Sequence, residues 1–416
     1  MSAHITLKSV KIWAIFFYVI FLIQVLAIQY VDMEHFGVVD KWQFVNPTYV
    51  SWVFIFYSLA GFMTAYFFML FFAQDKASIN KFYSYSIKPF YCKGSRNAII
   101  FFIFAMILYG YYSSVNYRLD GGPIDKLVMN SLSTLVYSMI LVLILVRKNF
   151  YNRKPSNLIL ILALLTLSSQ ITGMGSLIVL VSLVLIAILS DRKIFFRHII
   201  IYGMLAILIL LGMIIFLLNW KYGYELNSID SNRIYTTVEW VFQRLLTVPG
   251  SSVFLIENYQ NTSPVFGFEG AYEVFYKNFI KLIGGYSAEY RYSSLGQYNF
   301  ELFYIGKSID SPGLSPGIIG GALFFFPWFF AAFFSGILLF LILFIVSMNW
   351  SIFLVNQSIF VNFLFYYSTL NFFLLNPYSW LSIIDPGFVK FFVFLFTPYL
   401  LSLFCRLTWG EGEKNN

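Results

Sequence analysis

Long apolar runs separated by short polar segments extend from one end of the chain to the other. The runs lie at about 12–29, 48–72, 97–115, 127–146, 158–172, 175–190, 198–219, 318–348, 352–374 and 388–405. A helical membrane crossing needs about 20 apolar residues, and helices are the default spanning element because hydrocarbon offers the backbone no other hydrogen-bond partners. The pattern therefore predicts an all-α, polytopic membrane bundle with about ten transmembrane helices.

The apolar stretch from 158 to 190 is long enough for one helix of about 50 Å or for two short ones. Basic residues flank it on both sides, and two flanks on the same face of a membrane require an even number of crossings. We therefore expect two short helices joined by a turn at 168–176, where glycines supply a bend. A re-entrant pair satisfies the same parity, so the depth of this turn stays open.

Positive charge is concentrated in some of the segments between the runs. The segments 73–96, 147–154 and 191–197 are rich in Lys and Arg and carry at most one acid each, which makes them cytoplasmic by the positive-inside rule. Both termini then lie in the cytoplasm. We expect N-terminal transmembrane helices over 1–219, a large periplasmic loop over 220–316, and C-terminal transmembrane helices with a short cytoplasmic tail over 317–416.

Composition supports a chain that is mostly dissolved in lipid. Hydrophobic residues make up 59% and charged residues 11% of the chain, whereas a soluble domain carries about 25% charged residues. The net charge of +8 is spread over short clusters, which indicates membrane orientation and no nucleic-acid partner. Cys92 and Cys405 both fall on the predicted cytoplasmic side, so we expect no disulfide. No metal-ligand spacing or cofactor motif is present, and we expect neither a metal nor a cofactor.

The loop over 220–316 is the region with enough polar material for a site. Its acids are Glu225, Asp230, Glu239, Glu257, Glu269, Glu273, Glu289, Glu301 and Asp310. A helix is predicted over 234–247, and if it extends to Arg233, that residue and Arg244 lie about three turns apart on one face, with Trp240 between them. Such a pair suits a phosphate held by bidentate hydrogen bonds beside a stacked sugar ring. It equally suits a surface helix whose arginines reach lipid headgroups.

Two further segments of the loop carry patterned side chains. Residues 269–284 repeat Glu and Lys every four positions opposite aromatic residues, which is typical of an interfacial amphipathic helix with structural charges. In the segment 284–301, Arg291 stands between Tyr290 and Tyr292. Aromatic rings beside a guanidinium suit a carbohydrate or diphosphate ligand, and they suit a headgroup-level aromatic belt equally well.

The segment 308–328 is rich in Pro, Gly and Ser and leads into the eighth run. Its serines and glycines, Ser315 and Gly317 among them, can bring backbone N–H groups against an anion. Pro327 lies inside the apolar run and should break it, so we expect 316–326 to form a short tilted helix before the crossing begins.

The order of these features resembles the bacterial O-antigen polymerases of the Wzy type. The resemblance covers the topology, the arginine-bearing segment VFQRLLTVPG at 241–250, and SPGLSPGIIGGALFFFPW at 311–328. Members of that family often carry Ser-Pro-Gly, then Gly-Glu-x-Tyr, then Asn-Phe-Gly. Here Ser315-Pro316-Gly317 fits, but 320–323 lacks the acid and the tyrosine, and Phe326-Pro327-Trp328 replaces the last part. These departures argue against a catalytic role for this segment.

The resemblance implies a GT-C-like membrane glycosyltransferase that polymerises undecaprenyl-diphosphate-linked oligosaccharide units, with a chain-length regulator as a possible partner. Diphosphate is a good leaving group, so arginines can supply the charge stabilisation that a metal supplies elsewhere. The residues implied for catalysis are Arg244, Arg291 and the base Glu239, with Glu289, Glu301 and Asp310 as equal candidates for the base. The residues implied for substrate binding are Arg233, Trp240, Tyr290, Tyr292, Ser315 and Gly317.

Two other functions compete with polymerisation. An O-antigen ligase would move the finished glycan onto a lipid A core, but ligases carry an important histidine in the large loop, and 220–316 contains none. A polysaccharide flippase would have evenly spaced helices, short loops and charges inside the bundle. The long loop and the charge-poor helices favour the polymerase over both.

Overall fold

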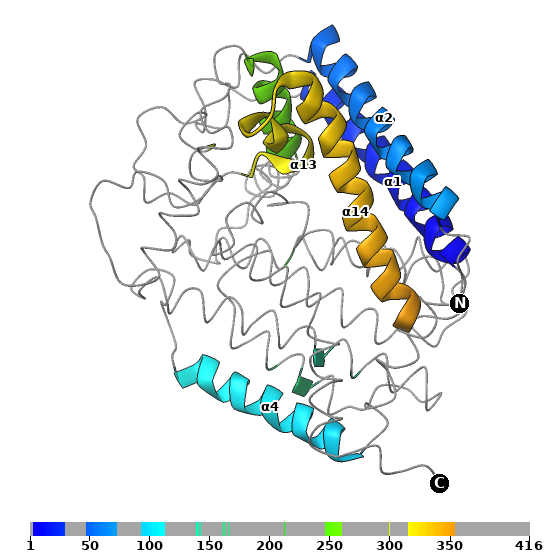
Figure 1. The fold of residues 1–416 in the computed structure, drawn as a ribbon. Helices are drawn as coiled ribbons and strands as arrows, with labels where there is room; N and C mark the ends of the chain where they lie inside the picture. Colours follow the sequence, from blue (N-terminus) through cyan, green and yellow to red (C-terminus); the bar gives the residue numbers. More distant parts are fainter. Residues whose placement is uncertain are drawn as a thin grey trace, which may run out of the picture.

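The computed structural model describes residues 3–29, 47–72, 93–112, 246–259 and 315–353, together with single positions at 139, 140, 143, 161, 162, 165, 212 and 299. The regular secondary structure of these described residues is helical throughout (Figure 1). The prediction of an all-α chain is therefore confirmed for this part of the sequence. The predicted runs at 175–190 and 388–405 lie outside the described residues.

The first three predicted runs form long helices. They are α1 over Ala3–Ile28, α2 over Tyr49–Phe72 and α4 over Lys93–Tyr112. Within the first two, Val10–Ile28 and Tyr49–Phe71 are long and apolar enough to cross a membrane. Helix α4 lies apart from α1, α2 and the later helix α14, over Trp328–Phe353 (Figure 1).

Helices α1 and α2 expose large apolar side chains along their length. The exposed fraction is 47% for Val19, 58% for Ile23 and 76% for Phe71. The core helix of a soluble protein buries such side chains, whereas lipid solvates them without cost. The exposed faces of α1 and α2 are therefore compatible with a membrane location for this chain.

The eighth predicted run is divided at the proline, as expected. It begins with the short helix α13 over Gly317–Gly320 and the 3₁₀ turn η5 over Gly321–Phe324, and the long helix α14 starts at Trp328, directly after Pro327. Proline lacks a backbone N–H and disfavours helical geometry in the residue before it, so a continuous helix cannot pass through this point. The predicted short helical segment before Pro327 is confirmed.

The helix of this run extends beyond the apolar pattern. The apolar runs lie at about 318–348 and 352–374, and α14 continues to Phe353. The intervening residues Asn349, Trp350 and Ser351 are more polar than their neighbours, yet none of them is a glycine or proline that would stop a helix. Polarity alone does not end a helix.

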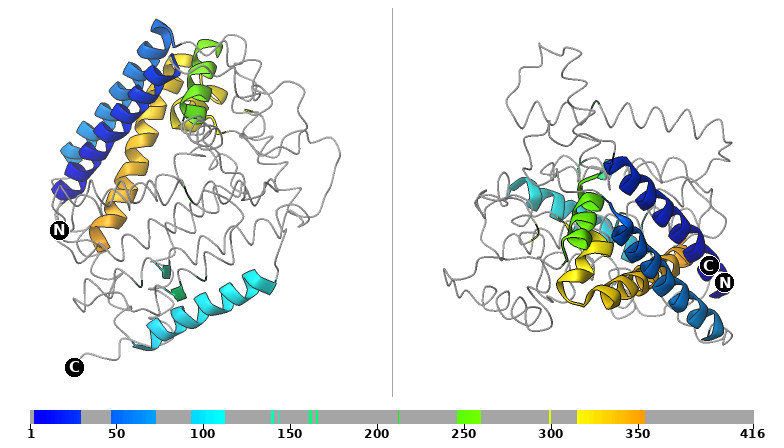
Figure 2. Two further views of the ribbon diagram at one scale, coloured as in Figure 1. Left: turned by 180° about the vertical axis from the view of Figure 1, so that it is seen from behind. Right: turned by 90° about the horizontal axis from the view of Figure 1, so that it is seen from above.

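Helices α2 and α14 pack side by side and run in the same direction, and α1 lies beside them (Figures 1 and 2). The aromatic contacts follow this register: the ring centroids of Phe54 and Trp328 are 5.1 Å apart near the N-terminal ends, and those of Phe62 and Phe340 are 5.7 Å apart further along. These helices correspond to the second and eighth predicted crossings, which alternation along the chain would make parallel.

Small residues allow the close approach of these helices. A Cβ atom added to Gly61 of α2 would lie 2.0 Å from the carbonyl oxygen of Phe333 in α14, so the backbones touch at this point. Glycine and serine at helix contacts are the usual device for such packing in membranes, where no hydrophobic force drives helices together. Three buried hydroxyls add polar contacts: Tyr18 Oη and Ser335 Oγ each lie 3.0 Å from Ser58 Oγ, and Ser335 Oγ donates to the carbonyl oxygen of Ala332 at 2.7 Å.

Candidate functional site

A helix over Leu246–Glu257, followed by a turn up to residue 259, packs against the end of the bundle at which α2 and α14 begin (Figures 1 and 2). We refer to this segment as the 246–259 helix. Its side chains are buried on every side, with Leu246, Val253 and Ile256 at most 4% exposed. The sequence patterns predicted helices over 234–247 and 269–284 in this region, but none over 248–259. Pro249 and Gly250, both poor helix formers, obscure the apolar segment that follows them.

The carboxylate of Glu257 caps the N-terminal end of α2. Its Oε1 accepts hydrogen bonds from the backbone N–H groups of Thr48, at 2.9 Å, and Ser51, at 3.2 Å. Its Oε2 accepts from Thr48 Oγ1 at 2.7 Å, and Ser51 Oγ donates to Oε1. The first N–H groups of a helix have no partner within the helix, and the helix dipole favours a negative charge there. We refer to Glu257 with Thr48 and Ser51 as the Glu257 cap.

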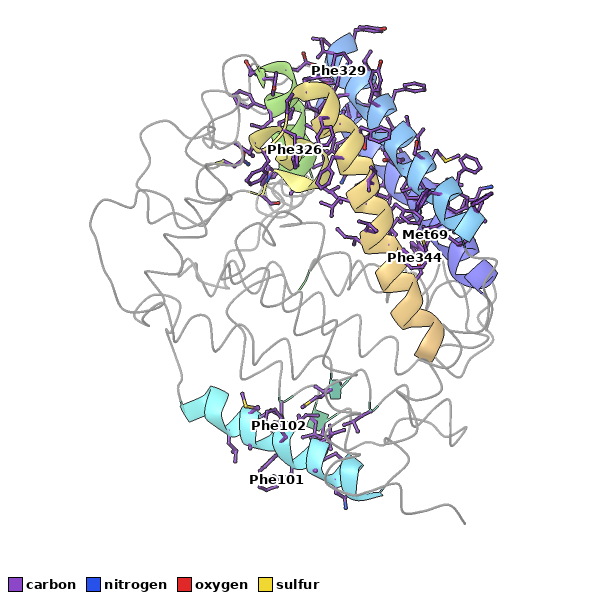
Figure 3. The ribbon with its side chains drawn as sticks, in the orientation of Figure 1. Met69, Phe101, Phe102, Phe326, Phe329 and Phe344 are labelled. Carbon is purple, nitrogen blue, oxygen red and sulfur yellow. The ribbon has the colours of Figure 1, made fainter. Side chains whose placement is uncertain are left out.

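The same helix also packs against the turn that leads into α13. Ser252 Oγ donates a hydrogen bond to the carbonyl oxygen of Pro316 at 2.8 Å. A Cβ atom added to Gly320 would lie 2.6 Å from Ser252 Cα, so this glycine lets the two segments approach to backbone contact. The Phe326 ring packs against Phe330 and Phe334 of α14, with ring centroids 5.2 and 4.8 Å away. Phe329 lies near the start of α2 (Figure 3), and its ring centroid is 5.3 Å from that of Tyr57.

The structure describes Ser315 and Gly317 of the predicted substrate-binding residues. Ser315 Oγ accepts a hydrogen bond from Gly317 N at 3.2 Å, which closes a local turn. Gly317 is buried with φ of +68°, and a Cβ atom added to it would lie 2.8 Å from Val248 Cγ1. Backbone conformation and packing therefore explain the glycine at this position. A contact of either residue with a substrate stays a prediction.

The other predicted site residues lie outside the described residues. They are Arg233, Glu239, Trp240, Arg244, Tyr290, Arg291 and Tyr292, and the alternative bases Glu289, Glu301 and Asp310. Arg244 precedes the first described residue of the 246–259 helix by two positions. The contact between Val248 and Gly317 thus joins two segments that each adjoin or contain predicted site residues.

The role of Glu257 was not predicted from the sequence. There it is one of nine acids of the region 220–316. Glu257 is the only acid among the residues that the structure describes, and it follows an apolar stretch, Val253–Ile256, without another charge nearby. An isolated carboxylate after an apolar segment could have indicated a structural contact. Its partner Thr48, however, is 209 residues away in the sequence and could not be identified from the pattern.

Neither a metal site nor a relative supplies further information about function. No group of three or more His, Cys, Asp or Glu side chains comes together among the described residues. No protein-family profile, curated protein or solved structure matches this chain.

Proposed function

We propose that this protein polymerises undecaprenyl-diphosphate-linked oligosaccharide units at the periplasmic face of a bacterial inner membrane. The proposal includes about ten transmembrane helices in a GT-C-like bundle, with both termini in the cytoplasm and the region 220–316 outside. The product is an O-antigen or a related surface polysaccharide. The transfer needs no metal, because guanidinium groups bear the charge of the leaving diphosphate.

The observation that carries the proposal is the packing of the 246–259 helix against the 315–326 segment. Val248 contacts Gly317, and Ser252 hydrogen-bonds to Pro316, so two segments whose described helices are shorter than a membrane crossing meet at one end of α2 and α14. One segment follows Arg244 and the other contains Ser315. If the helix predicted over 234–247 continues into the described one, Arg244 lies about one turn before Val248. An arginine there would face a lipid-borne diphosphate at the level of the bundle end.

The proposed reaction has three events that the side chains must support: attack by the acceptor, cleavage of the donor bond and transfer of a proton. The acceptor hydroxyl attacks the anomeric carbon of the donor sugar, the bond from that carbon to the diphosphate oxygen breaks, and the hydroxyl proton passes to a carboxylate base such as Glu239. The released undecaprenyl diphosphate carries the negative charge, which Arg244 and Arg291 stabilise by bidentate hydrogen bonds with Arg233 as a third. Trp240, Tyr290 and Tyr292 offer flat surfaces for the sugar rings.

The test is Arg244→Ala in a strain that depends on this protein for its surface glycan. We expect normal expression and membrane insertion, with long glycan ladders reduced to single repeat units. Lys281→Ala is the matched control, because that lysine belongs to the predicted amphipathic helix and should keep the ladder. Wild-type ladders in Arg244→Ala would remove this arginine from the mechanism.

Deletion of the gene for this protein in the same strain distinguishes a polymerase from a ligase and a flippase by the glycan product that accumulates. Deletion of a ligase leaves long polymer on its lipid carrier and none on the lipid A core. Deletion of a flippase leaves single lipid-linked units on the cytoplasmic face. Either product pattern contradicts polymerisation as the activity, and so does a strict requirement of the reconstituted protein for a divalent cation.

A further inference from the structure

We propose that Glu257 is a positioning residue that holds the 246–259 helix, and with it the arginine segment that precedes it, against the N-terminal end of α2. The positioning itself is argued from contacts between described residues. Its consequence for catalysis rests on the proposed function. The two parts of the inference are therefore tested by separate measurements.

The Glu257 cap is more than a solvated surface charge. Both carboxylate oxygens accept hydrogen bonds, and their donors are the backbone N–H groups and hydroxyls of Thr48, directly before α2, and of Ser51, in its first turn. Thr48 Oγ1 also accepts a hydrogen bond from Val50 N at 3.2 Å, so the same hydroxyl serves the helix end and the carboxylate. A carboxylate that was simply hydrated would not accept several hydrogen bonds from a segment about 209 residues away in the sequence.

Contacts at two levels hold the 246–259 helix. Glu257 fixes its C-terminal end to α2, while Ser252, about one and a half turns earlier, fixes its middle to Pro316. The segment after Pro316 leads through α13 and η5 into α14, and α14 returns to α2 through the Ser335–Ser58 hydrogen bond. The helix is thus part of a closed cycle of contacts between α2, the 315–326 segment and α14.

Loss of the Glu257 cap opens this cycle at one point and leaves the rest in place. The helix keeps its buried apolar side chains and the Ser252 contact, so it should stay folded but pivot about Ser252. Its position relative to α2 would then vary. A displacement of about 1 Å at a catalytic group can lower a rate about a hundredfold. We therefore expect Glu257 to affect turnover without contacting the substrate.

The first experiment measures position and does not depend on any activity. Tyr259→Cys, in a chain that also carries Cys92→Ser and Cys405→Ser, provides a thiol beside Glu257. Labelling by a membrane-impermeant maleimide should be about tenfold faster when Glu257→Ala is added, because the end of the helix separates from α2. Glu257→Gln should label near the parent rate, since its amide can both accept and donate hydrogen bonds in the same place. Equal labelling in Glu257→Ala and the parent chain overturns the positioning role.

The second experiment measures turnover of lipid-linked repeat units by the full-length protein in proteoliposomes. Glu257→Ala should lower kcat about tenfold or more with little change in KM, and Glu257→Gln should stay within about threefold of wild type. The pair Thr48→Val and Ser51→Ala should cause a smaller loss in kcat, because the backbone N–H groups of residues 48 and 51 still donate to Glu257. Adding Glu257→Ala to this pair should lower kcat only to the level of Glu257→Ala alone. Thr64→Val is the matched control, because the Thr64 hydroxyl donates only to Ala60 O within α2.

The remaining outcomes are also decisive. If Glu257→Gln is as inactive as Glu257→Ala while Thr48→Val with Ser51→Ala is unaffected, the carboxylate acts chemically and the positioning role is wrong. If activity falls only in parallel with the thermal unfolding temperature, Glu257 serves stability alone and the inference fails. If the wild-type protein turns over no lipid-linked unit, the proposed function fails, whereas the labelling result still decides the positioning role.

Discussion

Gly336 of α14 lies against Ser58 of α2 at backbone distance. A Cβ atom added to Gly336 would fall 1.8 Å from the carbonyl oxygen of Ser58 and 2.7 Å from the amide nitrogen of Phe62. Both atoms belong to the backbone, so no side chain can rotate away to make room. Together with Gly61, which meets Phe333 in the same way, this glycine sets the separation of the two helices.

The first prediction concerns this contact. Gly336→Ala should destabilise the protein by about 2 kcal/mol or more, because α2 and α14 must move apart along their whole length. Gly212→Ala is the control, since a Cβ atom there meets nothing within 4 Å. It should be neutral or slightly stabilising, as alanine is the better helix former. Thermal unfolding in detergent measures both, and equal unfolding temperatures for the two variants would contradict the packing.

The second prediction concerns the buried hydroxyls. Ser58 Oγ contacts both Tyr18 Oη and Ser335 Oγ, so Ser58→Ala should cost about 1–2 kcal/mol of stability. Ser335→Ala should cost less, about 0.6 kcal/mol, because it interrupts one of the two contacts. The double variant should cost less than the sum of the two, since the residues share a hydrogen bond. Additive losses measured by unfolding in detergent would show that the contact contributes nothing.

The third prediction separates two reasons for the glycine at 317. Gly317→Ala should destabilise the protein by about 2–3 kcal/mol, partly through its positive φ and partly through the clash with Val248. Adding Val248→Ala removes the clash but not the cost of the positive φ. The double variant should therefore lose less stability than the sum of the losses of the two single variants. Strict additivity would mean that only the backbone conformation requires glycine.

The fourth prediction concerns the exposed faces of α1 and α2. Nitroxide labels at Val19 and Met63, which are 47% and 39% exposed and lie near the middle of their helices, should be quenched by oxygen more than by a water-soluble nickel chelate. A label at Tyr49, 80% exposed at the start of α2, should be more accessible to the chelate. Preferential quenching by nickel at Val19 or Met63 would place those faces in water.

Several features of this protein follow from the sequence by itself. The positions of α1, α2 and α4, and the division of the eighth run at Pro327, were predicted because apolar length and proline geometry act locally along the chain. The end of α14 did not follow from the apolar pattern, because the helix continues past the run to Phe353 through polar residues that include no glycine or proline.

Only the tertiary structure decided which faces of these helices meet. In α2 and α14 the exposed side and the side toward a neighbouring helix are both apolar, so the hydrophobic pattern carries no information about pairing. Small residues at the helix contact have a structural role only because another helix approaches them. They are the glycines at 61 and 336 and the serines at 58 and 335. Glu257 is the clearest case, because its donors at Thr48 and Ser51 belong to a helix end that becomes its neighbour only when the chain folds.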